Sequence, residues 1–292
     1  MNAPELKPDS GRKLFYGLFI FPLVILAGMI VMVLTAVLLT HEKETPESLL
    51  TAIKTGSERK RWQKASELSN ELNRLPRGYR DAALGREIVA MLGDSKTYDA
   101  KTRAYLAVAL GHFDGQPEAE AALRRALDDA DPEVQFYAIW TLGLVGARSA
   151  APEILPFLKS DRSELRVNAA YVLGALGARE AVPALRPLVE DPVDDVRWNA
   201  ALALARLGDA SGLTVLTRMT DRRELETSRR MAEPEIENLM TNAIKGLALI
   251  PGPESIKILQ TLAREDRNLR VRQAAMDAMQ FQKKPDSGKI EN

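Results

Sequence analysis

Residues suited to acid–base or metal chemistry are scarce in this chain of 292 residues. It has two histidines, His41 and His112, and no cysteine, so a thiol nucleophile, a thiolate metal site and a disulfide are excluded. Neither histidine has a second ligand or a triad partner at a usable spacing. His41 ends an apolar segment, and His112 follows a Leu-Gly step typical of a helix end, where a positive charge is favourable. The sequence therefore predicts no catalytic residue, no metal ligand and no cofactor.

Patterns that bind phosphate or nucleic acid are also missing. The Gly-x-x-Gly pattern of this chain ends helices and does not open them, so no phosphate-binding loop is predicted. Lys plus Arg and Asp plus Glu number 40 each, and no basic block offers an electrostatic footprint for nucleic acid. We expect neither nucleic acid nor a small-molecule substrate as a ligand.

The helices that must position any site form a sequence repeat. "VRWNAALALARLG" at 196–208 matches "LRVNAAYVLGALG" at 165–177 in seven of thirteen positions, and "VQFYAIWTLGLVG" at 134–146 is a third copy. Successive copies are 31 residues apart, and each shows the i, i+4, i+7 apolar spacing of a helix face before a glycine suited to a helix end. A second helix, with an interior proline expected to bend it (Pro156 or Pro187), lies between copies. The pattern predicts an all-α solenoid of helical hairpins.

The segments "AAPEILPFLKSDRSELRVNAAYVLGALGA" and "AVPALRPLVEDPVDDVRWNAALALARLGD" resemble HEAT repeats, in the short variety of phycobilin-lyase-like proteins. The resemblance is strong over 117–209 and looser at 84–116 and 253–280, which implies six to seven repeats within 41–280. Two enzyme-like branches exist in the family. Deoxyhypusine hydroxylase binds iron through His-Glu pairs inside its repeats, whereas the one such pair here, His41-Glu42, lies outside them, so that activity is excluded. The lyase branch implies the alternative function, assistance in chromophore or cofactor attachment.

A membrane anchor precedes the repeats. Residues 14–40 contain no charged residue, and about 20 apolar residues suffice to cross a bilayer. The segment is longer than the apolar region of a signal peptide, and no good cleavage site follows it. We therefore expect a single-pass transmembrane helix. Arg12 and Lys13 favour a cytoplasmic tail at 1–13, which would place the C-terminal domain outside the cytoplasm, in the periplasm for a bacterial inner-membrane protein.

One repeat is longer than the others. Ala243 follows Ala200 by 43 residues instead of 31, which indicates an insertion at about 220–238. The insertion is either a solvated helical extension whose charges pair with one another, adding little to the stack, or a partner-binding loop. The tail at 281–292 is expected to be disordered.

Three kinds of residue recur on the repeated helices. Arg166 and Arg197, with Arg272 equivalent, are expected to bond the turn that precedes them. The amides of Asn168, Asn199 and Asn242 are expected to hydrogen-bond one another. An apolar stripe is explained either by packing between repeats or by an exposed groove for a partner; it comprises Phe136, Trp140, Tyr171, Trp198 and Leu202. From the stripe and the insertion, the candidate partner-binding residues are Trp140, Tyr171, Trp198, Arg222, Arg223, Arg229 and Arg230.

Together these features predict a non-enzymatic, membrane-tethered scaffold or adaptor. A solenoid offers an extended concave surface for proteins, and an anchor raises the local concentration of membrane partners. The expected partners are other proteins, as subunits of a membrane or envelope complex that this chain belongs to or helps to assemble. The alternative remains a lyase-like assistant of chromophore or cofactor attachment.

Overall fold

A computed structural model describes residues 16–40, 44–75, 81–113 and 115–283. All the regular structure in these ranges is helical, which confirms the predicted all-α class. The chain divides into two compact units, residues 1–45 and 46–292.

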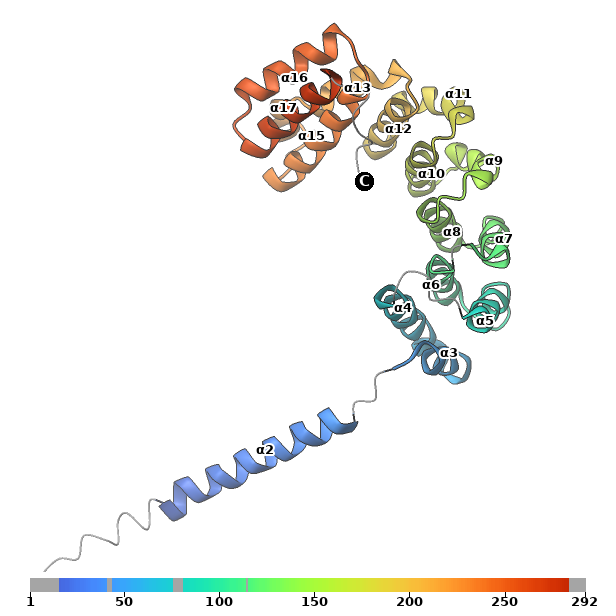
Figure 1. The fold of residues 1–292 in the computed structure, drawn as a ribbon, viewed down its shortest axis with the longest axis vertical. Coiled ribbons are helices and arrows are strands. Elements are labelled where there is room, and N and C mark those ends of the chain that lie inside the picture. The colour runs from blue at the N-terminus through green and yellow to red at the C-terminus, as the bar shows by residue number, and fades with distance from the viewer. Residues whose placement is uncertain (1–15, 41–43, 76–80, 114, 284–292) are drawn as a thin grey trace, which may run out of the picture. The chain divides into compact units, whose positions relative to one another are not determined.

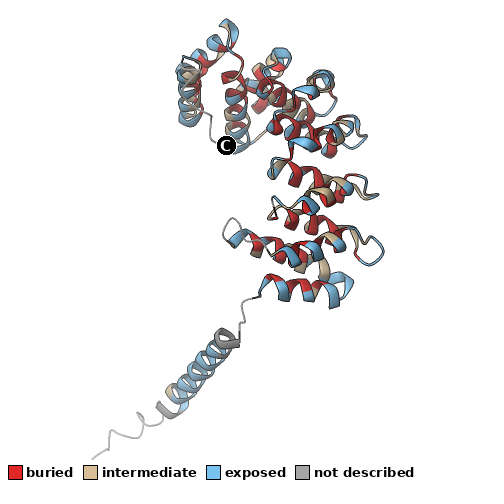
Figure 2. Cartoon of the chain, turned by 45° about the vertical axis from the view of Figure 1, so that its right-hand side comes forward, coloured by how far each residue is buried: buried red, intermediate tan, exposed pale blue. Residues whose placement is uncertain are grey.

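The first unit contains a short π-helix, η1 (Tyr16–Ile20), followed by helix α2 (Phe21–Thr40). The window Leu18–Thr35 is long and apolar enough to cross a membrane, and none of it is buried in the structure (Figure 2). Length and composition alone support a membrane span here. Arg12, Lys13 and His41, on which the expected orientation and border depend, lie outside the described residues.

The second unit is a stack of seven helix pairs within the described residues (Figure 1). The pairs are α3 (Pro46–Thr55) with α4 (Glu58–Arg74), α5 (Ala82–Leu92) with α6 (Ala100–Leu110), α7 (Pro117–Ala126) with α8 (Pro132–Leu144), α9 (Ala151–Ile154) with α10 (Ser163–Leu176), α11 (Val182–Leu185) with α12 (Asp194–Arg206), α13 (Leu213–Met219) with α15 (Glu233–Ala248), and α16 (Pro253–Glu265) with α17 (Leu269–Lys283). Helix α14 (Arg222–Thr227) belongs to the insertion. The tail expected from residue 281 starts no earlier than 284, because α17 runs through Lys283.

The second helix of each repeated pair ends as the sequence predicts. Gly177 and Gly208 adopt the left-handed conformation, with φ of 70° and 79°. This conformation turns the next N–H back to the helix, so that Ala178 donates to the carbonyl of Leu173 at 3.1 Å. The glycine therefore closes each helix and directs the chain into the next pair.

The interior prolines shorten the first helices of the central pairs. α9 stops before Pro156, and the chain continues as the 3-10 helix η3 (Leu155–Lys159). Pro187 does the same after α11, where η5 (Arg186–Glu190) follows. Proline removes the amide donor that an α-helix needs, so at the position where a bend was predicted the helix changes from the α to the 3-10 type. Three more 3-10 helices begin these first helices: η2 (Arg148–Ala150), η4 (Arg179–Ala181) and η6 (Ala210–Gly212).

The second helices carry most of the core. The repeated leucines Leu142, Leu173 and Leu204 are fully buried, as are the repeated alanines aligned with them. Small residues let neighbouring helices approach closely: a Cβ added at Gly174 in α10 would lie 2.7 Å from the Cα of Ala203 in α12. Consecutive second helices pack against each other more extensively than first helices do, which places them on the inner side of the curved stack (Figure 1).

Candidate partner-binding site

The exposed side of the second helices forms a regular surface. Residues at i, i+4, i+7 and i+11 share one helix face. On three successive second helices these residues are exposed or half-buried, apart from Asn168, which is buried. We call this surface, on three successive helices, the inner face. It consists of Glu133, Tyr137, Trp140 and Leu144 on α8, of Glu164, Asn168, Tyr171 and Ala175 on α10, and of Asp195, Asn199, Leu202 and Arg206 on α12.

An aromatic pair lies at the centre of the inner face. Trp140 and Tyr171 are 41% and 37% exposed, and their rings stack at a centroid distance of 5.7 Å with an interplanar angle of 18°. The guanidinium of Arg206 also lies over the Tyr171 ring, 5.2 Å from its centroid. Leu144, beside the pair on α8, is 64% exposed. The apolar stripe was expected either to pack between repeats or to form an exposed groove. The side chains of Trp140 and Tyr171 are exposed, as the second explanation requires.

The aromatic surface continues toward the amino-terminal repeats. Trp62 of α4 stacks on Tyr105 of α6 at 6.2 Å, and Tyr105 stacks on Tyr137 at 5.9 Å. Burial raises the pKa of Tyr137, and the neighbouring Tyr105 and Glu133 raise it further, so this phenol stays neutral. These three rings were not among the residues predicted from the sequence. Tyr137 precedes Asn168 by the 31-residue repeat, so the alignment itself carried the signal.

A row of carboxylates borders the aromatic pair. Glu133, Glu164 and Asp195 occupy the same position in three repeats and are all exposed. In the part of the chain that the structure describes, their carboxylates form no ion pair, whereas the neighbouring Asp194 binds Arg197 and Arg229. The inner face thus has an acidic edge, an aromatic centre and, at Arg206, a basic corner.

The predicted amide ladder is wrong where the structure tests it. Asn168 donates to the backbone carbonyl of Phe136 on the preceding second helix at 2.7 Å. Asn199 donates to the carbonyl of Asp195 in its own helix at 2.8 Å. Backbone carbonyls lie within reach of both side chains and satisfy them in place of another amide.

The repeated arginines are structural, as predicted for two of them. Arg166 donates to the carbonyl of Ser160 at 2.8 Å, and Arg197 donates to that of Asp191 at 2.5 Å, both in the preceding turn. Arg166 also forms a two-pronged pair with Asp191 of the next repeat, at 2.9 and 3.0 Å. Arg103 binds Asp129 in the same way, although it was not among the predicted arginines. The side chain of Arg272 forms no such bond among the described residues.

Arg222 in the insertion extends this series. Its guanidinium binds the buried Asp266 at 3.0 and 2.8 Å and reaches Glu233 at 2.7 Å. The expectation that the insertion adds little to the stack is therefore wrong, because Arg222 ties the sixth pair to the seventh. Arg223, by contrast, is exposed and its side chain has no polar partner in the described ranges.

The rest of the insertion closes over Trp198. Arg229 pairs with Asp194 and Glu224, and its guanidinium lies 5.4 Å from the centroid of the Trp198 ring. Trp198 is half-buried and packs against the carboxy-terminal core, which agrees with packing between repeats. Arg230 is exposed and has a φ of 53°, at the bend before α15. The structure thus separates Trp198 and Arg229 from the exposed pair on α8 and α10.

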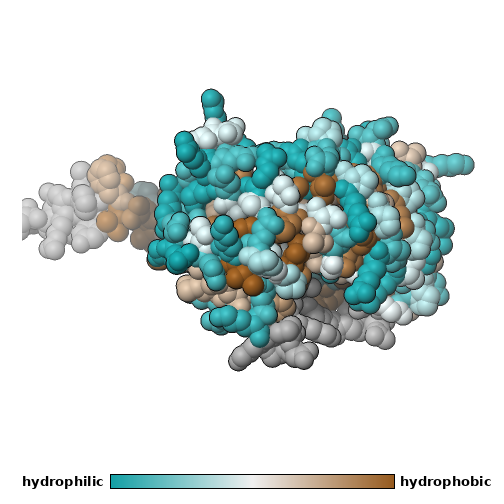
Figure 3. Space-filling view, turned by 90° about the horizontal axis from the view of Figure 1, so that it is seen from above, coloured by the Kyte–Doolittle hydropathy of each residue, from teal (hydrophilic) through white to brown (hydrophobic). Residues whose placement is uncertain are grey.

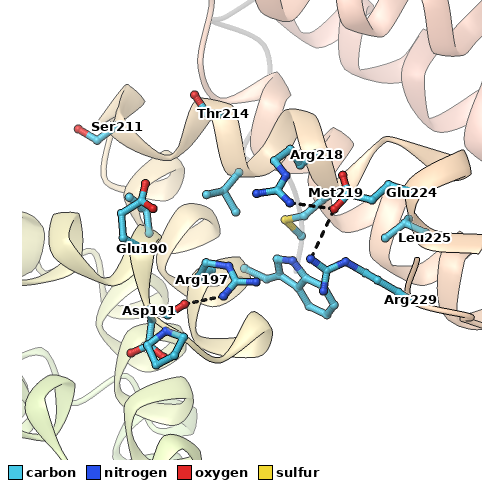
Figure 4. Close-up of a pocket in the computed structure, with 14 residues that line it drawn as sticks. Glu190, Asp191, Arg197, Ser211, Thr214, Arg218, Met219, Glu224, Leu225 and Arg229 are labelled. Atoms are coloured by element: carbon cyan, nitrogen blue, oxygen red, sulfur yellow. Dashed lines mark hydrogen bonds and ion pairs between the residues drawn. The ribbon is translucent and has the colours of Figure 1, made fainter. Parts of the chain in front are cut away.

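A pocket of about 400 Å³ lies at this junction (Figure 4). Its arginines, Arg197, Arg218 and Arg229, point toward acceptors within the protein: Arg218 binds Glu224 at 2.9 Å, and this pair raises the pKa of Arg218. The three arginines of the pocket are therefore paired with acceptors inside the protein. Among the described residues, no group of three or more His, Asp or Glu side chains could hold a metal ion, and His112 is half-buried at the end of α6.

The sequence matches the HEAT-repeat family over residues 89–165 and 151–237, which together span half of the chain. This chain belongs to the HEAT-repeat family. No curated protein matches it significantly.

Solved structures share the fold at low identity. The chain is similar to the complex of CpcE and CpcF of phycocyanin lyase from Nostoc sp. PCC7120, at 20% identity and a TM-score of 0.54, covering 83% of this chain and 96% of that chain. It is also similar to the Escherichia coli protein YibA, at 13% identity and a TM-score of 0.53, covering 82% and 93%. An engineered protein matches at 19% identity and a TM-score of 0.50, covering 82% and 68%. These likenesses show a shared solenoid fold.

Proposed function

We propose that this HEAT-repeat protein is a non-enzymatic, membrane-tethered adaptor that holds other proteins of a membrane or envelope complex on its inner face. The observation that carries the proposal is the exposed Trp140–Tyr171 stack on the inner side of the solenoid. Aromatic side chains of this kind dominate binding energy at protein interfaces, and solenoids use their concave surfaces for binding.

The apolar helix α2 supports the tethering part of the proposal. Its window Leu18–Thr35 suits a membrane span by length and composition. A tether confines the solenoid to the membrane surface, so that even a modest intrinsic affinity suffices for membrane-bound partners. The positive flank at Arg12 and Lys13 favours a solenoid outside the cytoplasm, in the periplasm of a bacterial cell.

Site-directed photocrosslinking in membranes tests the proposal. A photoreactive phenylalanine analogue at Leu144, on the inner face, should crosslink partner subunits. The same analogue at Ile256, an exposed position on the first helix α16, provides the control. Crosslinks that form equally from both positions, or from neither, would contradict binding at the inner face.

The alternative function makes a separate prediction. A lyase-like assistant of chromophore attachment should carry pigment, and the similarity to a phycocyanin lyase complex concerns the fold at 20% identity. Visible absorbance in the purified full chain, lost after replacement of inner-face residues, would favour the alternative over the adaptor.

A further inference from the structure

The inner face carries a chemical pattern that specifies its partner more narrowly than the proposed function does. Its acidic edge consists of Glu133, Glu164 and Asp195, all exposed and without an ion-pair partner in the described part of the chain. Seven residues further along each helix, the central row presents Trp140, Tyr171 and Leu202. One turn beyond that row, Arg206 forms the basic corner over Tyr171.

From this pattern we infer that the inner face binds an amphipathic helix of a partner protein, with Lys or Arg along one edge and apolar residues beside them. The inference rests on the proposed adaptor function. Three repeated carboxylates attract a basic edge, whereas they repel the phosphates of nucleic acid and of anionic lipid headgroups. The stacked pair of Trp140 and Tyr171 offers an apolar anchor next to that edge.

The geometry of the solenoid sets the spacing of the basic residues. Packed helices lie about 8–10 Å apart, so consecutive carboxylates of the acidic edge are separated by about that distance. An α-helix rises about 1.5 Å per residue, so seven residues of the partner cover about 10.5 Å. A partner helix that crosses α8, α10 and α12 therefore meets one carboxylate at each of positions i, i+7 and i+14. Within each second helix, the seven residues between the acidic and aromatic rows span a similar distance, which matches the 10–12 Å diameter of a helix.

The acidic edge has one competing explanation. Glu133, Glu164 and Asp195 each lie in the first turn of a helix, where a carboxylate also stabilises the helix dipole. The dipole effect predicts a change in stability, whereas a docking edge predicts a change in binding. A matched set of variants separates the two, because Glu118, Glu180 and Glu254 are exposed first-turn carboxylates on first helices, away from the inner face.

The test uses the full chain in nanodiscs of zwitterionic lipid, with empty nanodiscs as the blank. The probe is a fluorescent helical peptide with Lys at i, i+7 and i+14 and Leu beside each Lys; binding is followed by anisotropy. The triple variant Glu133→Gln, Glu164→Gln, Asp195→Asn should weaken binding on the order of tenfold. Trp140→Ala should weaken it by tenfold or more. The triple variant Glu118→Gln, Glu180→Gln, Glu254→Gln should bind the peptide like the parent protein.

Two further peptides test register and charge. One has the same composition with Lys at i, i+4 and i+11, and the other has Glu in place of Lys; both should bind at least several-fold more weakly. Equal binding of the three peptides would overturn the inference, as would equal effects of the two triple variants. If Leu144 still crosslinks partners in membranes in that case, the adaptor function stands and only the partner chemistry is wrong. If Leu144 crosslinks nothing while the peptide binds as expected, the proposed native function fails instead.

Discussion

Arg222→Ala should destabilise the carboxy-terminal end of the solenoid strongly. The substitution removes both hydrogen bonds to Asp266 and leaves that carboxylate, whose side chain is 4% exposed, without its cation. Breaking a buried ion pair by removal of one partner costs about 3–5 kcal/mol. Arg222 keeps 14% of its side-chain surface exposed, and the N–H of Asn268 still donates to Asp266 at 2.8 Å. Both facts reduce the cost, so we expect a loss of about 2–4 kcal/mol in the free energy of unfolding of this end.

Arg223→Ala is the matched control. Arg223 is adjacent to Arg222, lies in the same short helix and is exposed. Its replacement should change the free energy of unfolding by no more than about 0.5 kcal/mol. The two substitutions remove the same charge from the same segment, so the difference between them measures the contribution of the ion pairs that Arg222 forms with Asp266 and Glu233.

Native-state hydrogen exchange read by mass spectrometry provides the assay. Stability in a solenoid is a sum of local terms, so Arg222→Ala should lower protection in α15, α16 and α17 and leave α6 to α10 nearly unchanged. Equal exchange profiles for Arg222→Ala and Arg223→Ala would refute a structural role for Arg222. A uniform loss from α3 to α17 would refute the treatment of the stack as locally coupled repeats.

Three more predictions concern helix packing, the pH dependence of stability and membrane topology. Gly174→Ala should cost about 1–3 kcal/mol in thermal or denaturant unfolding, because the new Cβ would lie 2.7 Å from Ala203; Ala175→Gly, at the exposed neighbouring position, should cost about 1 kcal/mol at most. Arg186 holds the pKa of Asp209 at about 2, below its ordinary 3.8. The stability that this pair contributes is therefore complete above pH 4 and falls as the pH drops toward 2. The denaturation midpoints of the parent protein and of Asp209→Asn should differ at pH 7 and converge near pH 2. A reporter that is active only outside the cytoplasm, fused after Asn292, should give a signal, and a signal from a cytoplasm-only reporter would reverse the proposed orientation.

The fold could be predicted because the same residue types recur at equivalent positions in successive helix pairs. Leu173 and Leu204 are separated by one repeat length and do the same task, so their recurrence shows both a helix and its buried face. Gly177 and Gly208 recur because each ends its helix with a positive φ. Residues that satisfy a local requirement are visible in sequence through their spacing alone.

Contacts that cross the insertion could not be predicted in this way. Arg222 and Asp266 are 44 residues apart, and although Asp266 aligns with Asp191 of the repeat, Arg222 lies in the insertion, outside the repeat period. The charges within the insertion suggested pairing inside that segment, which Arg222 and Glu233 do form, but Arg222 also pairs with the buried Asp266 in the turn between α16 and α17. Similarly, the repeated asparagines suggested mutual bonding, but the position of a nearer backbone carbonyl decides which acceptor Asn168 uses.

The candidate site was predictable as a set of residues but not as a surface. The sequence placed Trp140, Tyr171 and Trp198 on one stripe, but the structure divides them. Trp198 occupies the position equivalent to Phe136 in the repeat and packs against the carboxy-terminal core, beside Arg229 of the insertion. Arg229 lies over the half-buried Trp198, whereas Trp140 and Tyr171 remain 41% and 37% exposed even with Arg206 over Tyr171.

The carboxylates of the acidic edge differ from the other repeated residues in their burial and pairing. Repeated residues that the stack requires are buried or paired, as Leu204 and Arg166 are, but Glu133, Glu164 and Asp195 recur while remaining exposed and unpaired in the described chain. Their recurrence is therefore a requirement of the helix dipole or of a partner. The matched triple variants distinguish these two causes, because both sets alter first-turn carboxylates and only one set lies on the inner face.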